Sequence, residues 1–341
     1  MRERPGADGR AAACSERGGA VARVCVIGSS NLDFTVTVPR LPGVGETVSG
    51  GTLVTSPGGK GANQAVAARR LGADVAFVTL LGADPMGDRL AAALAEAGLP
   101  SEPIGRTGEA PTGVALIAVD PEGRNQIAVA PGANHRLTPD RVRSHADLLA
   151  RAEVALLQLE TPIDTVGWAL AEARRLGKRT VLNPAPARVL PIPADLLPLV
   201  DYLTPNEIEA ELLTDRHVRS LDDAEAAGRA LVARGVSTVV VTLGVAGAVA
   251  VRAAGTLRVP AFPVEAIDTV GAGDAFSGAL AACLAAGAPI EDALLVASAA
   301  GALTCTRRGA LDALPTREEV VALMDRHDRR PSTAWQTGWM R

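Results

Sequence analysis

The feature of this sequence that most constrains its fold is an alternation of short apolar segments with helical patterns. The apolar segments are "VARVCVIG", "DVAFVTLLG", "EVALLQLE", "RTVLNPAP", "VDYLTPNE" and "VSTVVVTLG". Helices are expected around residues 86–97, 163–176 and 224–233, and as an alanine-rich pair between 273 and 306. Apolar strands separated by helices predict an α/β fold with a parallel sheet that helices cover on both faces.

A second set of segments shows a period of two and lies outside this alternation. "DFTVTVPR" and "ETVSGGTLVTS" form one pair, and "TGVALIAVD" and "RNQIAVA" form another. Alternating apolar and polar residues are typical of half-exposed strands. We therefore expect a small antiparallel sheet outside the main core, over about residues 33–56 and 110–132.

Composition and charge exclude several classes of function. The chain has 34 Lys and Arg against 38 Asp and Glu, a formal net charge of −4, so it lacks the basic excess that nucleic-acid binding requires. No apolar run is long enough to indicate a membrane span. The four cysteines form no CxxC pair and the four histidines show no metal spacing. This pattern favours free thiols in the cytoplasm over disulfides or a zinc site.

The two ends of the chain differ in composition from its middle. Residues 1–20 are polar and glycine-rich, with no apolar stretch that would indicate a signal peptide. We expect a disordered extension there, one folded domain over residues 21–328, and a flexible tail over residues 329–341.

Polar stretches follow the apolar segments. They are "GSSNLD", "QLE", "NPAP", "TPNE" and "TLG", together with "DTVGAGD", which continues the strand-like segment "VEAIDTV". In parallel sheets, ligands bind at the edge where the carboxyl ends of the strands meet. The sequence therefore predicts that the functional site lies at this edge.

The segment "DTVGAGDAFSGAL" is the best candidate for binding an anion. Its turn, Gly271-Ala272-Gly273, is followed by a helix that begins with Asp274. Small residues let backbone N–H groups converge, and a helix N-terminus adds partial positive charge. Asp274 then stands where a general base would be needed. An ordinary tight turn with a helix-stabilising aspartate is the alternative, because short glycine motifs are weak signals.

The stretch "SPGGKGANQAVAARRLG" has the outline of a phosphate-binding loop, but its spacing differs. A Walker loop has a Gly, four residues, then Gly-Lys and a Ser or Thr. Here Lys60 is followed by Gly61, and no glycine stands five positions before Gly59. This turn is therefore expected to hold something other than phosphate. A dinucleotide site is also disfavoured, because "GSSNLD" rather than GxGxxG follows the first strand.

Seven segments, in order, resemble the motifs of the ribokinase family of sugar kinases. They are "GSSNLD", "GGKGANQAVAARRLG", "QLETP", "LNPAPAR", "TPNEIEAE", "TLGVAG" and "DTVGAGDAFSGAL". The match extends from about residue 24 to about residue 326. The resemblance implies a three-layer α/β domain in which the small sheet is a lid over the sugar.

In that family the "GGKGAN" segment holds the sugar. The positions that match sugar-binding ones are Asn31, Asp33, Gly59, Lys60, Asn63 and Glu160, together with Asp274. An amide and a carboxylate can bind neighbouring hydroxyls and reject a substrate that lacks one. Taken singly, these residues also suit a helix-entry turn, a loop cap or a solvated carboxylate.

The positions that match nucleotide-binding ones are Asn206, Glu209, Thr242, Gly244, Gly247, Gly273 and Ser298. The resemblance implies that Asn206 and Glu209 lie near the phosphates and Mg²⁺, that the "TLGVAG" loop binds ATP, and that Ser298 lies near the base. Without the resemblance, an N-cap with an acidic first turn would be the preferred interpretation of the Asn-x-x-Glu pair.

The activity that the resemblance implies is ATP-dependent phosphorylation of D-ribose at O5, giving D-ribose 5-phosphate and ADP. Asp274 would accept the O5 proton, and the N–H groups of Gly271, Ala272 and Gly273 would hold the charge that grows on the γ-phosphoryl oxygens. A related kinase acting on deoxyribose, a ketose or a nucleoside is an alternative, and so is a non-catalytic sugar-binding regulator.

The resemblance also implies a monovalent cation and a second subunit. Family members commonly hold K⁺ beside the anion site, and the matching positions are Asp268, Val270, Thr304, Arg307, Gly309 and Ala313. The family often has Ser where this chain has Ala313, so one oxygen ligand is missing. For Asp268 the alternative is a turn-capping carboxylate. The free edge of the lid predicts a homodimer.

Overall fold

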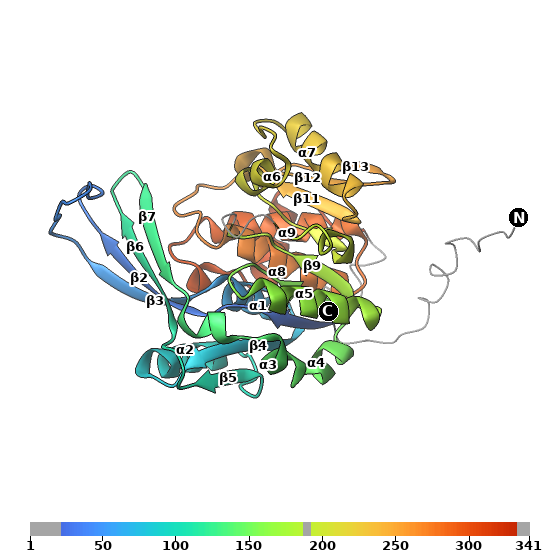
Figure 1. Cartoon of the computed structure of the whole chain (residues 1–341). Coiled ribbons are helices and arrows are strands. Elements are labelled where there is room, and N and C mark those ends of the chain that lie inside the picture. The colour runs from blue at the N-terminus through green and yellow to red at the C-terminus, as the bar shows by residue number, and fades with distance from the viewer. Residues whose placement is uncertain (1–21, 187–191, 333–341) are drawn as a thin grey trace, which may run out of the picture.

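The structure is a computed structural model that describes residues 22–186 and 192–332 (Figure 1). The expected N-terminal extension lies outside the described residues. The first part of the expected tail is anchored rather than free. The Arg329 guanidinium stacks 4.0 Å from the centroid of the Phe262 ring, and the Ser332 N–H donates to the Asp292 carboxylate at 2.8 Å.

The main sheet has nine strands within the described residues, in the order β13-β12-β11-β10-β9-β8-β1-β4-β5. All neighbours from β5 to β11 are parallel, which confirms the predicted α/β sheet. Strand β5 and the antiparallel hairpin β12–β13 were not predicted. The strands are β1 (Arg23–Ile27), β4 (Asp74–Gly82), β5 (Ile104–Thr107), β8 (Val154–Leu157), β9 (Arg179–Leu182), β10 (Tyr202–Leu203), β11 (Thr238–Thr242), β12 (Ala248–Arg252) and β13 (Gly255–Val259).

Helices cover both faces of this sheet, because successive strand residues point to opposite faces and both faces are apolar. In β1, Val24 and Val26 belong to one core cluster, and Cys25 and Ile27 belong to the other. The first cluster includes α1 (Lys60–Arg70), α2 (Pro85–Glu96), α8 (Ala272–Ala285), α9 (Ile290–Thr304) and α10 (Arg317–Arg326). The second includes α3 (Pro139–Arg143), α4 (Ala146–Arg151), α5 (Ile163–Arg175), α6 (Glu207–Thr214) and α7 (Leu221–Ala233).

The predicted small sheet is present and projects from the body beside the main sheet (Figure 1). Its strands lie in the order β3-β2-β6-β7, with bounds β2 (Asn31–Thr37), β3 (Leu53–Gly58), β6 (Gly113–Val119) and β7 (Asn125–Ala130). The two outer pairs are antiparallel as expected, and the central pair of β2 and β6 is parallel. We refer to this sheet as the lid.

Two segments that were expected to be strands are irregular. Only the second half of "ETVSGGTLVTS" is extended, because Gly50 and Gly51, which precede β3, both have positive φ. The segment "VEAIDTV" forms no strand either. The N–H groups of Ile267 and Asp268 both donate to the Cys305 carbonyl, so this segment follows the turn after α9 rather than a neighbouring strand.

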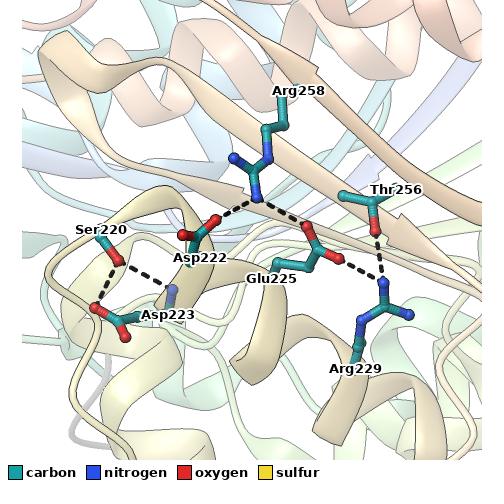
Figure 2. A network of polar contacts seen from close by, with 7 residues as sticks. All are labelled: Ser220, Asp222, Asp223, Glu225, Arg229, Thr256 and Arg258. Carbon is teal, nitrogen blue, oxygen red and sulfur yellow. Dashed lines mark hydrogen bonds and ion pairs between the residues drawn. The ribbon is translucent and has the colours of Figure 1, made fainter.

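The edge strand β13 is tied to helix α7 by charged side chains (Figure 2). Arg258 of β13 pairs with Asp222 and Glu225. The Arg229 guanidinium pairs with Glu225 and also donates to the Thr256 hydroxyl of β13. Exposed ion pairs of this kind contribute little to stability. Their more useful effect is to place charge along a sheet edge, which disfavours pairing with another chain.

Candidate active site

The polar stretches meet at one edge of the main sheet, as predicted. Gln158, Asn183 and Thr204 each follow the last residue of β8, β9 and β10, and Thr242 ends β11. A cavity of about 180 Å³ opens at this edge. Its lining is Lys60, Asn183, Ala185, Thr204, Asn206, Glu209, Thr242, Thr269, Gly271, Gly273, Asp274, Phe276 and Ser277.

The predicted anion site is the N-terminus of α8. Gly271 is its N-cap residue with φ of 80°, a backbone conformation that favours glycine. Gly271, Gly273 and Asp274 line the cavity, so the first turn of α8 points its unpaired N–H groups toward that space. Of the described residues, Ala272 lies outside the lining, and its N–H donates to the Thr269 carbonyl at 3.3 Å. Ala272 therefore fits the predicted role less well than its neighbours.

Asp274 is buried, with 6% of its surface exposed, and both carboxylate oxygens accept hydrogen bonds from α1. Asn63 Nδ2 donates to Oδ2 at 2.9 Å, and Gln64 Nε2 donates to Oδ1 at 2.9 Å. The two helices approach closely at Gly278, where a Cβ would lie 2.5 Å from the Gln64 carbonyl oxygen. This contact between α1 and α8 brings the "GGKGAN" and "GAGD" segments together.

The turn before α1 packs against the backbone at the start of β2. Gly59 is the N-cap with φ of 92°, and a Cβ there would lie 2.7 Å from the Asn31 backbone nitrogen. Because glycine has no side chain for capping, Glu160 supplies the cap. Its Oε2 accepts from the Lys60 N–H at 3.1 Å and from the Ser29 hydroxyl at 2.5 Å. Glu160 is therefore not merely a solvated carboxylate; it fixes the start of α1.

Asn31 and Asp33 project from the same face of β2, since they are two residues apart on a strand. Asn31 is held by Asn134, whose Nδ2 donates to Asn31 Oδ1 at 2.8 Å. Asp33 Oδ1 is buried without a hydrogen-bond partner among the described residues. Burial, together with the charges of Glu160 and Asp274, raises the pKa of Asp33 to about 7.

Lys60 lies among carboxylates. Burial by itself would lower its pKa, but the charges of Asp274, Glu160, Glu209 and Asp33 outweigh that effect, and its pKa is raised. Lys60 therefore stays protonated at neutral pH. It also lines the cavity with the residues of the predicted anion site, so a position predicted to bind the sugar borders the position predicted to bind phosphate.

Asn206 and Glu209 form a reciprocal capping box at the start of α6. Asn206 Oδ1 accepts from the Glu209 N–H at 2.8 Å, and Glu209 Oε2 accepts from the Asn206 N–H at 2.9 Å. Both residues also line the cavity, so the cap and the predicted role near the phosphates are compatible. Burial raises the pKa of Glu209.

The predicted ATP loop is only partly joined to this cavity. Thr242 lines it, whereas Gly244, Gly247 and Ser298, although described, lie outside that lining. Gly247 has φ of 95°, and a Cβ there would lie 2.1 Å from the Val259 carbonyl oxygen, which explains the glycine structurally. Ser298 is half-buried on α9.

Three of the predicted cation residues come together. Asp268 Oδ1 accepts from the Val270 N–H and Oδ2 accepts from the Gly309 N–H, each at 3.0 Å. Asp268 thus joins the loop before α8 to the turn after α9. The other side chains point to different partners, because the Thr304 hydroxyl donates to the Ala300 carbonyl and the Arg307 guanidinium pairs with Glu319. Ala313 is buried in a short 3₁₀ turn.

Comparison with known proteins identifies the family. The model of the pfkB family of carbohydrate kinases matches residues 21–317. The chain belongs to this family. A curated ribokinase from Haemophilus influenzae is 39% identical over 300 residues, which cover 88% of this chain and 97% of that protein. A deoxyribokinase from Salmonella typhimurium is 34% identical, covering 87% of this chain and 96% of that protein.

A solved relative within the pfkB family has the same fold. The structure of Arabidopsis thaliana ribokinase complexed with ribose and ATP superposes with a TM-score of 0.83 at 31% identity. The match covers 89% of this chain and 99% of that one. The three-layer fold and the ribokinase-like resemblance are thus confirmed.

Several site residues of this pfkB-family chain were not assigned from the sequence. Gln64, Gln158, Asn183 and Asn134 are all buried polar residues with side-chain hydrogen bonds at the site. Gln64 could have been noticed, because a glutamine in the alanine-rich run "ANQAVAA" has few reasons to be buried unless it binds something. The others bond to Gln64 or Asn31 across more than 90 residues of sequence, beyond any local pattern.

In residues 22–186 and 192–332, no group of three or more His, Cys, Asp or Glu side chains could hold a metal ion. In the same ranges, no helix combines the length and apolar character needed to cross a membrane.

Proposed function

We propose that this chain transfers the γ-phosphoryl group of ATP to O5 of D-ribose, giving D-ribose 5-phosphate and ADP. One observation supports this proposal most strongly. The buried carboxylate of Asp274 accepts a hydrogen bond from Asn63, whose own oxygen is buried without a partner among the described residues, and it lines the cavity together with the first turn of α8. That position suits a group that must accept a hydroxyl proton beside an incoming phosphoryl group.

The sugar side contains polar atoms that need a ligand. Asp33 Oδ1 and Asn63 Oδ1 are both buried without partners among the described residues. Because Asn63 Nδ2 donates to Asp274, its oxygen is left facing away from that carboxylate. Both unpaired atoms are acceptors, and sugar hydroxyls are donors that can satisfy them. Asn31 and Lys60 complete the set of side chains near the sugar.

The phosphate side supplies charge rather than covalent chemistry. The N–H groups of the first turn of α8 hold negative charge on the transferring group, and Lys60 adds a positive charge in the same cavity. Asp274 accepts the O5 proton as the oxygen attacks. Closure of the lid would exclude water from the transfer. These roles need alignment and electrostatics, which is what phosphoryl transfer requires of a protein.

ATP and Mg²⁺ fit the donor set on this side. Glu209 and Asn206 line the cavity beside the anion site and offer hard oxygen atoms. Mg²⁺ usually keeps several waters and takes only one or two protein carboxylates in addition to substrate phosphates. Bound in that way, the ion would neutralise charge on the phosphates without a cage of protein ligands.

We also propose that a K⁺ ion binds beside the anion site. Asp268 bridges the loop before α8 and the turn after α9, as a cation between them would also do. Both Asp268 oxygens already accept a hydrogen bond from an N–H group, so each would bind the ion with a remaining lone pair. Backbone oxygens around Val270, Thr304, Arg307, Gly309 and Ala313 would supply the remaining ligands.

We also propose that two lids associate to form a homodimer. Phe34 and Leu116 are register partners in the lid, and both project from the face opposite Asp33. A hollow of about 380 Å³ opens on the lid and includes Phe34, Val36, Leu53, Leu116 and Ile127 in its lining. On that face, Leu53 and Leu116 are each more than half exposed. An apolar face of this kind is typical of an interface, and sedimentation velocity would show whether the chain is a dimer.

The cytoplasm is the compartment that we propose, since ATP is available there and the buried cysteines Cys25 and Cys283 are free thiols.

The experiment that tests the function is a coupled ADP-release assay across ribose, 2-deoxyribose, fructose and nucleosides, with and without Mg²⁺. Ribose should give the highest kcat/KM. It should exceed 2-deoxyribose by about tenfold or more, because a buried acceptor left without its hydroxyl costs about 1–3 kcal/mol. A higher kcat/KM for 2-deoxyribose would assign the chain to the deoxyribokinase branch. Sugar binding without ADP release would indicate a regulator.

A further inference from the structure

The catalytic aspartate occupies a helix position where carboxylates elsewhere in this chain behave differently. Asp274 is the third residue of α8, and Glu209 and Glu319 are the third residues of α6 and α10. Glu209 and Glu319 both turn back to the N–H of their own N-cap residue. Asp274 has no such bond to the N-cap of α8 in the described structure. Its two carboxylate oxygens accept hydrogen bonds from Asn63 and Gln64 of α1 instead.

Gln64 holds Asp274 Oδ1, and residues outside α1 determine which way the Gln64 amide is turned. Asn183 Nδ2 donates to the Thr204 backbone carbonyl at 2.9 Å. A carbonyl can only accept, so Asn183 must turn its oxygen toward Gln64, where it accepts from Nε2 at 3.1 Å. The same Nε2 donates to Asp274 Oδ1 at 2.9 Å. Both protons of the Gln64 amide are therefore used.

The other end of the Gln64 amide is also fixed. Gln158 Nε2 donates to Gln64 Oε1 at 2.7 Å. The chain of bonds thus runs between two groups that can only accept, the Thr204 carbonyl and the Asp274 carboxylate, with Gln64 held at three points. Gln64 and Gln158 are 0% and 1% exposed, so water does not compete for these bonds.

We propose that Gln64 is a positioning residue for phosphoryl transfer, which orients the Asp274 carboxylate to receive the sugar proton. The inference rests on the proposed kinase function. Gln64 contacts the catalytic carboxylate, and its three bonds lie on the protein side of Asp274. A donated hydrogen bond favours the charged form of a carboxylate. It also prevents the carboxylate from turning back to cap α8.

The test uses full-length protein and the coupled ADP-release assay over a range of pH. Gln64→Met keeps the length of the side chain and removes both donors and the acceptor. We expect kcat to fall about 10- to 100-fold, since small misplacements of a catalytic group have effects of this size. The KM values for ribose and ATP should change by less than about threefold, because transition-state alignment is what is lost.

The pH profile separates positioning from simple packing. Without the Gln64 donor, the acidic limb of kcat, which reports the enzyme-substrate complex, should move to higher pH. Gln64→Glu should move it further, because it places a second carboxylate against Asp274. The other charged groups acting on Asp274 are Asp33 of β2, Lys60 of α1 and Glu209 of α6, and these substitutions remove none of them.

A matched control removes a buried side-chain hydrogen bond elsewhere. Thr165 is 0% exposed, and its hydroxyl donates to the Leu137 carbonyl at 2.6 Å in the opposite core cluster. Thr165→Val should lower the melting temperature and leave the pH profile and kcat unchanged. If Gln64→Met fails to fold, Gln158→Met loosens Gln64 without touching Asp274, and it should shift the acidic limb in the same direction by less.

The double variant Gln64→Met/Asp274→Asn gives the decisive comparison. If Gln64 acts through Asp274, the double variant should lose no more activity than Asp274→Asn alone. Additive losses, or folded Gln64 variants with a wild-type kcat and acidic limb, would overturn the positioning role. An inactive wild-type enzyme would instead reject the proposed kinase function, so the two failures are distinguishable.

Discussion

The sugar side and the phosphate side of this active site are built by different kinds of contact. On the sugar side, side chains bond across long stretches of sequence, as between Asn63 and Asp274, which are 211 residues apart. On the phosphate side, several bonds are short-range caps, such as Asn206 with Glu209, three residues apart, and Asp268 with Val270, two residues apart. The sugar side therefore depends on the whole fold, whereas much of the phosphate side is specified locally.

This difference has a consequence for ligand recognition. Long-range amide bonds fix which atom of each side chain is left for a ligand, as with Asn63 Oδ1. Side chains held in this way can therefore distinguish individual hydroxyls of a sugar. A helix N-terminus presents backbone N–H groups that accept any suitably placed phosphate. We therefore expect specificity on the proposed sugar side and general charge stabilisation on the proposed phosphate side.

The largest expected effect comes from the residue where the two sides meet. Asp274→Asn should lower kcat by at least about 10²-fold, the lower end of what loss of a general base costs. The substitution should still fold, because Asn63 can rotate its unpaired oxygen toward the new amide while Gln64 stays in place. Ribose affinity, measured by calorimetry, should fall by less than about tenfold, since one acceptor is used up.

Asp292→Asn is the matched control, because Asp292 is a buried aspartate in the first turn of the neighbouring helix α9 and lies away from the cavity. Its turnover should equal that of the wild type. Near wild-type turnover in Asp274→Asn would remove Asp274 from the role of base.

The next effect belongs to the sugar side alone. The pKa of Asp33 is raised to about 7, so this carboxyl takes up a proton in the free enzyme as the pH falls through neutrality. If ionised Asp33 accepts ribose hydroxyls, kcat/KM for ribose should fall by up to about tenfold per pH unit below 7. Stability should change in the opposite direction. The folded state binds the proton more tightly than the unfolded state, so stability decreases as the pH rises from about 4 to about 7.

Asp33→Asn separates this titration from the others in the site. The variant should lose both pH dependences in that window, which initial rates and thermal melts between pH 5 and pH 8 would detect. Unchanged profiles in Asp33→Asn would mean that another group titrates there.

Much of this architecture was predictable because local sequence patterns determine it. The α/β alternation, the small sheet and the placement of Thr242 at the end of β11 follow from periodicity and strand ends. The capping box at Asn206 was also visible as a local alternative. The segment before Gly271 was misassigned as a strand, because its apolar alternation is satisfied by the turn at Cys305 rather than by a sheet neighbour.

The parts that could not be predicted depend on contacts between distant residues. No spacing rule joins Gln64 to Asn183 or Gln158, since those bonds exist only after α1, β8 and β9 have packed together. The role of Glu160 as the cap of α1 is of the same kind, because its partner N–H is 100 residues away. The family resemblance placed Glu160 among the sugar-binding positions but did not indicate that it caps α1.

A smaller effect is expected on the phosphate side, from the monovalent cation. K⁺ should raise kcat over Na⁺ at equal ionic strength by up to about tenfold, because it would improve the alignment of the loop before α8 by about the energy of one hydrogen bond. Asp268→Ala should abolish this response by releasing the Val270 and Gly309 N–H groups. Equal rates in K⁺-free Na⁺ buffer and in K⁺ buffer would remove the cation site and leave the kinase assignment intact.

The smallest expected effect comes from one local motif, the capping box, which occurs at two positions in the fold. Helices α6 and α10 both begin with a capping box, Asn206 with Glu209 and Thr316 with Glu319, but only the first lines the cavity. Asn206→Ala and Thr316→Ala should each lower the free energy of unfolding by about 1 kcal/mol, measured by urea denaturation, since each loses one N-cap bond. Only Asn206→Ala should also raise the KM for ATP. If both variants leave that KM unchanged, the Asn206 cap is purely structural and the phosphate side is specified by α8 and Lys60. If both raise it equally, loss of stability rather than local contact is responsible.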